Sequence, residues 1–245
     1  MSSLPIYKAV RTVLPGEEVA ARLAALVASD LRQAIAERGR ARIVLAGGST
    51  FSEAYQLLAN LPDIDWSRVT VLFGDERCIP PTNPDSNFHL ADIAFLFQVH
   101  PGHIVRMEGE VPPEEGAYRY LEMLYTLGNR ELPIFDLVLL GMGPDGHTAS
   151  VFRGSLKRAL QTGAAVIITE PEVTGPPVTR LTMTPALLNR ARHTVIAVRG
   201  EEKAGAVAEL YGRRGDRLPA AHIAAALGPT DLILDQAAAS QLPAQ

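Results

Sequence analysis

Residues 135–150 read FDLVLLGMGPDGHTAS, a continuous apolar run that ends in a glycine-rich turn. Apolar runs of this length are typical of strands that are buried on both faces, as in parallel sheets. Comparable runs stand at 68–76 (RVTVLFGDE) and 193–200 (HTVIAVRG), and amphipathic helical patterns at 16–37 and 113–128 alternate with them. This alternation predicts an α/β fold in which helices cover both faces of a mostly parallel β-sheet.

The length and the charge balance describe a globular protein without bulk affinity for polyanions. The chain has 245 residues, and 23 basic against 27 acidic side chains give a net charge of −4. This balance excludes binding of nucleic acid or of an anionic membrane through overall charge. No linker, repeat or low-complexity segment divides the chain, so we expect a single α/β domain over residues 1–245.

Three further features indicate the compartment. Cys78 is the only cysteine, which excludes an internal disulfide and favours a reducing environment. The uncharged run at 93–105 is too short to cross a bilayer, and residues 1–12 (MSSLPIYKAVRT) lack the apolar segment of a secretory leader. We therefore expect a cytoplasmic protein with no membrane partner.

Unusual sequences follow or end four of the expected strands. They are AGGST at 46–50, GDER at 74–77, GMGPDGHT at 141–148 and RGEEK at 199–203. In open parallel sheets, ligands bind beyond the carboxyl ends of the strands. We therefore expect these four segments to meet at one edge of the sheet and to form one site.

The first of these segments consists of Gly47, Gly48, Ser49 and Thr50, and an expected helix follows at 51–60. Glycines let a backbone approach a ligand closely, and the free N–H groups of a helix N-terminus attract anions. The segment therefore suits a phosphate group, although it is not a Walker A loop because no Gly-Lys-Ser/Thr follows. A tight strand-to-helix turn with a hydroxyl cap is the alternative.

The second segment contains Asp75, Glu76 and Arg77. Because side chains alternate along a strand, Asp75 and Arg77 are expected to point the same way and Glu76 the opposite way. A carboxylate and a guanidinium side by side suit a polar substrate, and a simple ion pair at a strand end is the alternative.

The third segment, 141–148, formally contains the G-x-G-x-x-G pattern of dinucleotide-binding loops. Asp145 would place a carboxylate where the pyrophosphate belongs, and Gly154 is expected to cut the following helix short, so we reject that interpretation. Asp145 and His147 instead suit a carboxylate that orients an imidazole for acid–base chemistry. A divalent ion held by Asp75, Asp145 and His147 is a weaker alternative.

Two cations complete the candidate site. Arg180 lies at the start of an expected strand and Lys203 in the first turn of an expected helix. A cation at a helix N-terminus opposes the helix dipole, which favours an anion beside it. Both residues are therefore candidates for binding an anionic group of a ligand.

Taken together, these motifs resemble a known family. The segments are LAGGST at 45–50, FGDERCIPPTNPDSN at 73–87, FDLVLLGMGPDGHTASVF at 135–152 and RLTMTPALLNRARHTVIAVRGEEKA at 180–204. They resemble the 6-phosphogluconolactonases, which belong to a superfamily that includes glucosamine-6-phosphate deaminase. The resemblance implies a modified Rossmann-like, mostly parallel sheet with helices on both faces. One departure is Phe51, where members of the family usually have proline.

The resemblance also implies a function. The reaction would be hydrolysis of 6-phospho-D-glucono-1,5-lactone to 6-phospho-D-gluconate in the pentose phosphate pathway, with no organic cofactor, no metal and no partner beyond this small molecule. We expect a monomer. By position in the family's motifs, the phosphate-binding residues correspond to Gly47, Gly48, Ser49, Thr50, Arg180 and Lys203, and the catalytic histidine corresponds to His147.

In the expected mechanism, His147 acts as general base on water and is oriented by Asp145 or Asp75. Arg77 stabilises the oxyanion or holds the sugar hydroxyls. One alternative is a deaminase/isomerase acting on glucosamine 6-phosphate, but the related deaminases carry a glutamate five residues after the histidine, where this chain has Phe152. A non-catalytic sugar-phosphate sensor is the second alternative, which the intact acid–base residues disfavour.

Overall fold

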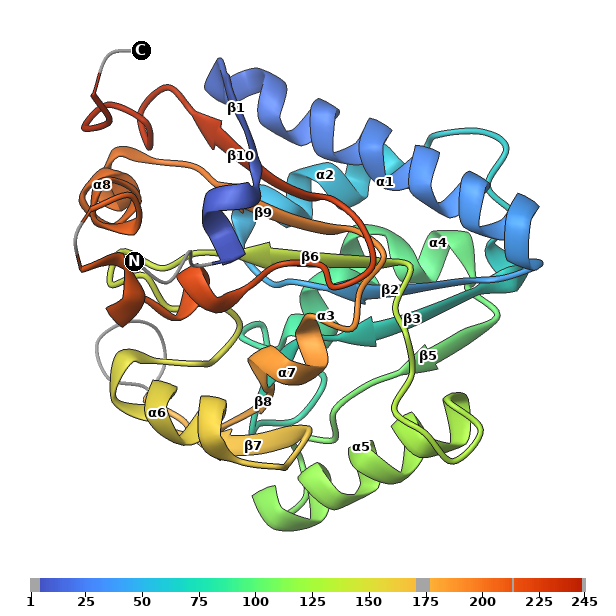
Figure 1. Ribbon diagram of the computed structural model, residues 1–245. Coiled ribbons are helices and arrows are strands. Elements are labelled where there is room, and N and C mark those ends of the chain that lie inside the picture. The colour runs from blue at the N-terminus through green and yellow to red at the C-terminus, as the bar shows by residue number, and fades with distance from the viewer. Residues whose placement is uncertain (1–4, 171–176, 213, 244–245) are drawn as a thin grey trace.

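A computed structural model describes residues 5–170, 177–212 and 214–243, and Figure 1 shows its ribbon. Seven parallel strands form the main sheet in the order β1-β10-β9-β6-β2-β3-β5. The strands of this sheet are β1 (Val10–Leu14), β2 (Ala41–Leu45), β3 (Val69–Phe73), β5 (His103–Val105), β6 (Leu137–Gly141), β9 (Thr194–Val198) and β10 (Thr230–Asp235). A separate antiparallel sheet consists of β4 (Asp75–Arg77), β8 (Arg180–Met183) and β7 (Val166–Thr169).

Helices of very different lengths connect the strands. The α-helices are α1 (Gly16–Arg38), α2 (Ser49–Ala59), α3 (Asn87–Ala91), α4 (Phe97–Val99), α5 (Pro113–Leu127), α6 (Arg153–Gln161), α7 (Pro185–Leu188) and α8 (Ala204–Leu210). A π-helical turn joins α3 to α4, and short 3-10 turns include Glu201–Lys203 and Pro219–His222. None of the helices in the described part of the chain has the length and apolar character needed to span a bilayer. Residues 1–4, part of the segment considered for a leader, lie outside the described residues.

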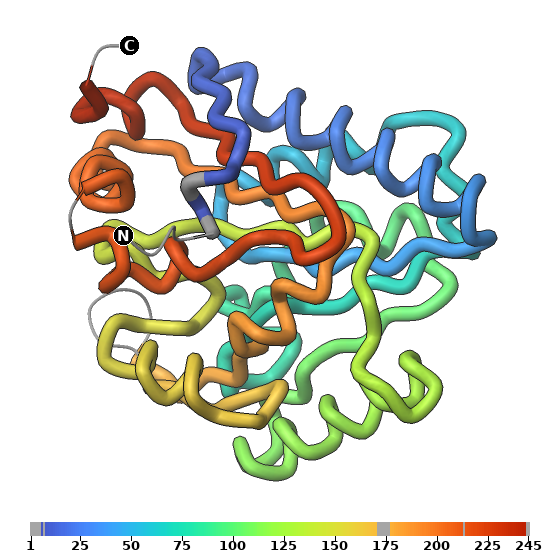
Figure 2. The backbone as a smooth tube through the Cα atoms, in the orientation of Figure 1, coloured from blue at the N-terminus to red at the C-terminus, as the bar shows by residue number. Residues whose placement is uncertain are grey.

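The alternation of side chains along the parallel strands produces two apolar cores. Ile43 and Leu45 of β2 pack in a core that includes the buried residues of α1 and α2, whereas Val44 belongs to the core on the opposite face. Each fully buried aliphatic side chain of this kind contributes about 1.5–3 kcal/mol. The predicted α/β fold with helices on both faces is therefore confirmed, and Figure 2 shows that the first and last strands lie side by side in it.

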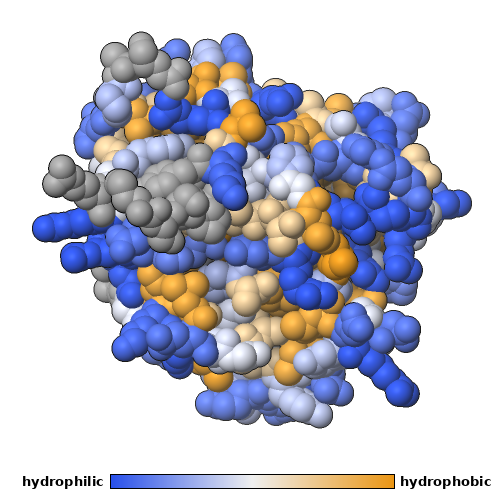
Figure 3. All heavy atoms as spheres, in the orientation of Figure 1, coloured by the Kyte–Doolittle hydropathy of each residue, from blue (hydrophilic) through white to orange (hydrophobic). Residues whose placement is uncertain are grey.

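The face seen in Figure 3 is mostly polar, with apolar residues scattered among charged ones. The exposed apolar side chains include Val10 and Leu160, which lie on separate elements. Scattered exposed apolar residues are normal for a globular surface.

The segment that we expected to be a single strand through residue 76 is divided between the two sheets. Strand β3 ends at Phe73, and Gly74 donates its N–H to the Leu45 carbonyl of β2 while its own carbonyl accepts from the Met183 N–H of β8. The chain thus passes from the parallel to the antiparallel sheet at one residue. Asp75 therefore begins the separate strand β4 rather than ending β3.

Two helix predictions are wrong. Gly154 does not cut a helix short, because α6 begins at Arg153 and Gly154 occupies its first turn. The alanine-rich segment 220–228 (AAHIAAALG) also predicts a helix, but the structure has only the 3-10 turn Pro219–His222 there. Asn189 explains the second error, because its carbonyl accepts from the Ala226 N–H and its side chain accepts from the Ala224 N–H. These tertiary hydrogen bonds replace the intrahelical ones that the alanine-rich sequence favours.

His193, directly before β9 at the amino-terminal end of the strands, links α1 to the main sheet. Its Nδ1 lies 2.6 Å from the Asp30 carboxylate of α1, and its Nε2 lies 3.3 Å from the Asp231 carboxylate of β10. Burial alone would lower the pKa of His193, but the two carboxylates outweigh burial and raise it above its ordinary value. The protonated ring therefore bridges two elements that are far apart in sequence.

We predict that His193→Gln lowers the free energy of unfolding by about 2 kcal/mol near pH 6, because both charge-assisted contacts are lost. A raised pKa in the folded state means that this stabilisation is fully present below the ordinary imidazole pKa and disappears as the pH rises through the raised value. Urea denaturation measured between about pH 6 and about pH 9 should show the difference from wild type shrinking with pH. His103→Gln, on the exposed edge strand β5, is the control. A deficit that is the same at every pH would contradict the charged bridge.

Candidate active site

A cavity of about 480 Å³ lies at the carboxyl ends of the central strands. The cavity lies between β2 and β6, where the order of the strands reverses. From β2 the sheet continues through β3 and β5 to one edge, and from β6 it continues through β9, β10 and β1 to the other edge. Ligands in open parallel sheets bind at such a switch point. The four segments that we expected to meet do so: the lining includes Gly47, Gly48, Asp75, Arg77, Gly143, His147 and Lys203, together with Arg180 from the antiparallel sheet.

His147 and Asp145 form a hydrogen-bonded pair in the loop after β6. The Nδ1 of His147 lies 2.6 Å from the Asp145 Oδ1, and the same oxygen accepts from the His147 backbone N–H at 3.2 Å. Burial opposes ionisation of Asp145, but the hydrogen bond and the charge of His147 outweigh it and hold the pKa of Asp145 below its ordinary value. An ionised Asp145 fixes the tautomer that carries its proton on Nδ1, which leaves Nε2 free to accept a proton.

Two neighbours set the position of the imidazole. A Cβ atom on Gly143 would lie 2.1 Å from the His147 ring, so only glycine at this position lets the ring fold back over the loop. On the other side, the buried ring of Phe152 packs against the imidazole with 4.9 Å between the ring centroids. Phe152 therefore occupies the place beside the histidine with an apolar ring and not with a carboxylate.

Asp75 enters the same cavity with partners of its own. Its Oδ2 accepts from the Ser150 hydroxyl at 2.5 Å, and its Oδ1 accepts from the Asn87 amide at 3.2 Å. Among the described residues, Asp145 is the carboxylate that contacts the His147 ring. The geometry thus leaves Asp75 facing the cavity, where it can accept hydrogen bonds from a ligand hydroxyl or from water.

Glu76 points away from the cavity, as the alternation along a strand requires. Its carboxylate accepts from the backbone N–H groups of Asn87 and Phe88, each at 2.8 Å, and from the Ser86 hydroxyl at 2.9 Å. Burial raises the pKa of Glu76 despite these donors. The carboxylate caps the start of α3, and this capping holds Asn87 against the site.

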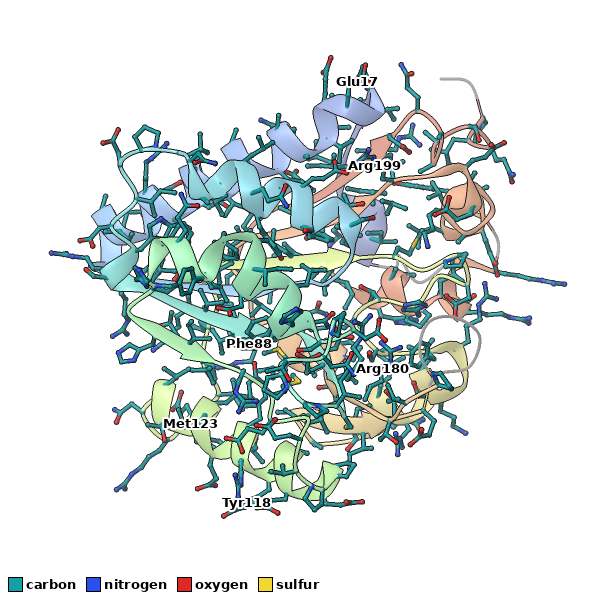
Figure 4. All side chains as sticks on the ribbon, turned by 180° about the vertical axis from the view of Figure 1, so that it is seen from behind. Glu17, Phe88, Tyr118, Met123, Arg180 and Arg199 are labelled. Atoms are coloured by element: carbon teal, nitrogen blue, oxygen red, sulfur yellow. The ribbon has the colours of Figure 1, made fainter. Side chains whose placement is uncertain are left out.

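Arg77 and Arg180 lie directly opposite each other in the pairing of β4 with β8. Both line the cavity, and Arg180 is 5% exposed. Burial and the charge of Arg77 lower the pKa of Arg180. Like charges directly opposite in an antiparallel pair are destabilising, so this arrangement favours an anion between or beside the two guanidinium groups. In Figure 4, Arg180 lies inside the outline of the molecule, whereas Tyr118 projects at the periphery.

The glycine loop after β2 forms one wall of the cavity. Gly47 and Gly48 line it, and Ser49 and Thr50 form the first turn of α2 beside it. Opposite them, Lys203 lies at the start of α8, with its Nζ 3.8 Å from the Glu202 carboxylate. The loop and the lysine together can receive a phosphate group through backbone N–H groups and a positive charge.

Sequence reasoning missed Asn87, Ser150 and Glu202. Asn87 is 3% exposed, and its Oδ1 has no hydrogen-bond partner among the described residues although the side chain lines the cavity. The sequence offers one signal for Asn87. It follows Ser86 at the end of the turn-rich segment 79–87, and serine is a residue type that often precedes the start of a helix. No sequence pattern connects Ser150 with Asp75, the carboxylate to which its hydroxyl donates, because the two residues are 75 positions apart.

Two further kinds of chemistry, a nucleophilic Cys78 and the divalent ion considered above, find no support in the described residues. Burial, followed by the nearby carboxylates of Glu170 and Glu76, raises the pKa of Cys78 to about 11, so this residue is a thiol near neutral pH and not a nucleophile. The described part of the chain contains no group of three or more His, Cys, Asp or Glu side chains arranged to hold a metal ion.

Comparison with protein families gives a match to the model described as glucosamine-6-phosphate isomerases/6-phosphogluconolactonase, over residues 15–232. The chain belongs to this family. A 6-phosphogluconolactonase of Synechocystis is 38% identical over 200 residues, covering 78% of this chain and 79% of the relative. The crystal structure of 6-phosphogluconolactonase from Thermotoga maritima has a TM-score of 0.83 at 25% identity, covering 94% of this chain and 100% of that one.

A solved structure with a different activity has a similar fold. A monomeric glucosamine-6-phosphate deaminase has a TM-score of 0.75 at 20% identity, covering 95% of this chain and 99% of the deaminase. At this identity the likeness establishes the fold alone. The residues of the cavity, not the fold, must separate the two reactions.

We predict that Gly47→Ala lowers kcat/KM at least about tenfold in an assay of 6-phosphogluconolactone hydrolysis, the activity of the named relatives. The reason is that a displacement of a site residue by about 1 Å is costly for catalysis. The new Cβ would lie 2.0 Å from the Asn87 Oδ1 and would displace the side chain that holds Asp75. Gly163→Ala, where a Cβ meets nothing within 4 Å, is the matched control.

The double variant Gly47→Ala/Asn87→Ala tests the cause. If displacement of Asn87 explains the loss, the double variant should be no worse than Asn87→Ala alone, whereas independent effects would add. Full additivity, measured as kcat/KM in the four proteins of this cycle, would refute the steric explanation.

Proposed function

We propose that this protein hydrolyses 6-phospho-D-glucono-1,5-lactone to 6-phospho-D-gluconate. The observation that carries the proposal is the His147–Asp145 pair, whose imidazole lines one cavity together with Arg77, Arg180 and Lys203. A lactone is an activated ester, so its hydrolysis needs a general base, a stabilised oxyanion and a protonated leaving oxygen. The family relatives named as 6-phosphogluconolactonases support the same reaction.

In the proposed mechanism, Nε2 of His147 removes a proton from water as the water oxygen attacks C1 of the lactone. The carbonyl electrons move onto oxygen, and Asp145 stabilises the imidazolium. The tetrahedral intermediate collapses with cleavage of the bond between C1 and the ring oxygen. His147 then returns its proton to that oxygen, which becomes a hydroxyl group of the product.

The cations of the site divide between the two ends of the substrate. Arg77 stabilises the oxyanion or holds sugar hydroxyls beside Asp75. Gly47, Gly48, Ser49 and Thr50, together with Arg180 and Lys203, bind the 6-phosphate. Binding energy from this remote group positions the ring for attack.

The alternative reaction, deamination of glucosamine 6-phosphate, lacks one element that sequence reasoning associated with it. In place of the expected glutamate, Phe152 packs on the His147 ring. The two reactions are separated by assaying ammonia release from glucosamine 6-phosphate beside lactone hydrolysis. Ammonia release as fast as lactone hydrolysis would overturn the proposal.

We also propose that the protein acts in the oxidative pentose phosphate pathway. In this proposal it is a cytoplasmic monomer that needs no cofactor. The substrate also opens spontaneously, so every rate must be compared with an enzyme-free reaction. NMR of freshly prepared lactone follows both the loss of substrate and the appearance of the acid.

We predict that His147→Ala lowers kcat by about 100-fold or more, because general-base catalysis is lost. Asp145→Asn should also lower kcat while KM changes little, because the amide cannot stabilise the imidazolium that forms during the reaction. Replacement of the exposed His103 by alanine is the control. Wild-type turnover in His147→Ala would remove this residue from the mechanism.

We predict that Lys203→Ala raises KM for the phosphorylated lactone about tenfold or more, because one charge-assisted contact to the phosphate is lost. Turnover of unphosphorylated D-glucono-1,5-lactone should be unaffected by the same change. Lys157→Ala, on the exposed face of α6, controls for loss of surface charge. An equal loss with both lactones would show that Lys203 does not bind the phosphate.

A further inference from the structure

A second cavity, of about 420 Å³, lies at the opposite end of the same central strands. The residues that line it lie before β6 and β9 and before or at the start of β2, whereas the candidate active site lies beyond the carboxyl ends of these strands. The two cavities are separated by the length of these five-residue strands, which is about 17 Å. The second cavity is rich in guanidinium groups, which come from Arg38, Arg40, Arg42, Arg190 and Arg192.

The charges that line this cavity do not balance. Its acidic lining residues are Glu131 and Asp136, so five arginines against two carboxylates leave +3, in a chain whose net charge is −4. Asp136 is shared, because it lies 2.9 Å from Arg38 and 3.7 Å from Arg192 and also accepts from the Arg42 backbone N–H. Arg38 is also paired with Glu37, which does not line the cavity, so the local excess of positive charge is +2 once Glu37 is counted.

The individual arginines differ in how they are held. Arg42 donates to the carbonyl of Leu127, the last residue of α5, and Arg190 donates to the Leu132 carbonyl of the following loop at 2.7 Å, so backbone carbonyls hold both guanidinium groups. Arg40 is exposed and makes no hydrogen bond or ion pair with the described residues. Burial and the charge of Arg40 lower the pKa of Arg42. The cluster thus combines positioned guanidinium groups with repulsion that the neighbouring carboxylates compensate only in part.

We propose that this cavity is a second anion-binding site and that it takes a small ligand with two phosphoryl groups. Guanidinium groups bind phosphate oxygens through paired, charge-assisted hydrogen bonds. Five guanidinium groups line the cavity, and one phosphoryl group carries only about 1.5 to 2 negative charges at pH 7, so a ligand with two phosphoryl groups engages more of them than a ligand with one. The volume and the charge of the cavity both fit such a ligand.

Isothermal titration calorimetry with inorganic pyrophosphate tests the proposal on the full chain. The variant Arg40→Gln/Arg192→Gln should bind pyrophosphate at least about tenfold more weakly than wild type. Arg22→Gln, which removes an exposed charge on α1, should bind as wild type does. Lys203→Ala should retain binding at this site, because Lys203 lies at the other end of the strands. Unchanged kcat/KM of the double variant would show that its fold is intact.

Several results would overturn the proposal. They are wild-type affinity in the double variant, loss of all pyrophosphate binding in Lys203→Ala, equal weakening in Arg22→Gln, or no binding by the wild-type protein. Orthophosphate provides the remaining comparison. If orthophosphate binds as tightly as pyrophosphate, the site does not recognise two phosphoryl groups.

Discussion

The hydrogen bonds of Gly74 to both sheets determine where the polar residues of the cavity stand. Its N–H belongs to the parallel sheet through Leu45, and its carbonyl belongs to the antiparallel sheet through Met183. Because the chain changes sheets at this residue, Asp75 and Arg77 do not continue beyond the end of β3. They turn into the cavity at the ends of β2 and β6, and Arg77 comes to lie opposite a second arginine.

The order of the parallel strands supplies the rest of the geometry. Strands β2 and β6 are neighbours although the chain forms two other strands of the sheet, β3 and β5, between them. The glycine loop at 46–48 and the loop that carries His147 therefore both line the cavity at the switch point. One loop offers backbone N–H groups to an anion, and the other offers a hydrogen-bonded imidazole.

Much of this arrangement follows from short-range rules that a sequence displays directly. The alternation of side chains correctly separated Asp75 and Arg77 from Glu76, and the apolar runs correctly identified the central strands. Residues that act through tertiary contacts escaped the same rules. Asn87 joins the site because Glu76 caps the turn before it, and Asn189 replaces the hydrogen bonds of an expected helix. Neither interaction leaves a periodic signal in the sequence.

Local charge, rather than net charge, explains how an acidic protein can offer sites for anions. The facing pair Arg77 and Arg180 is unfavourable by itself, since burial and mutual repulsion both disfavour the charged guanidinium of Arg180. An anion bound beside the two guanidinium groups would relieve that repulsion, and the relief would add to the free energy of binding. The crowding of Arg40 on Arg42 at the opposite end of the strands has the same physical character. The net charge of −4 therefore says little about either cavity. Each cavity gathers several basic side chains, while the excess of acidic side chains lies elsewhere in the chain.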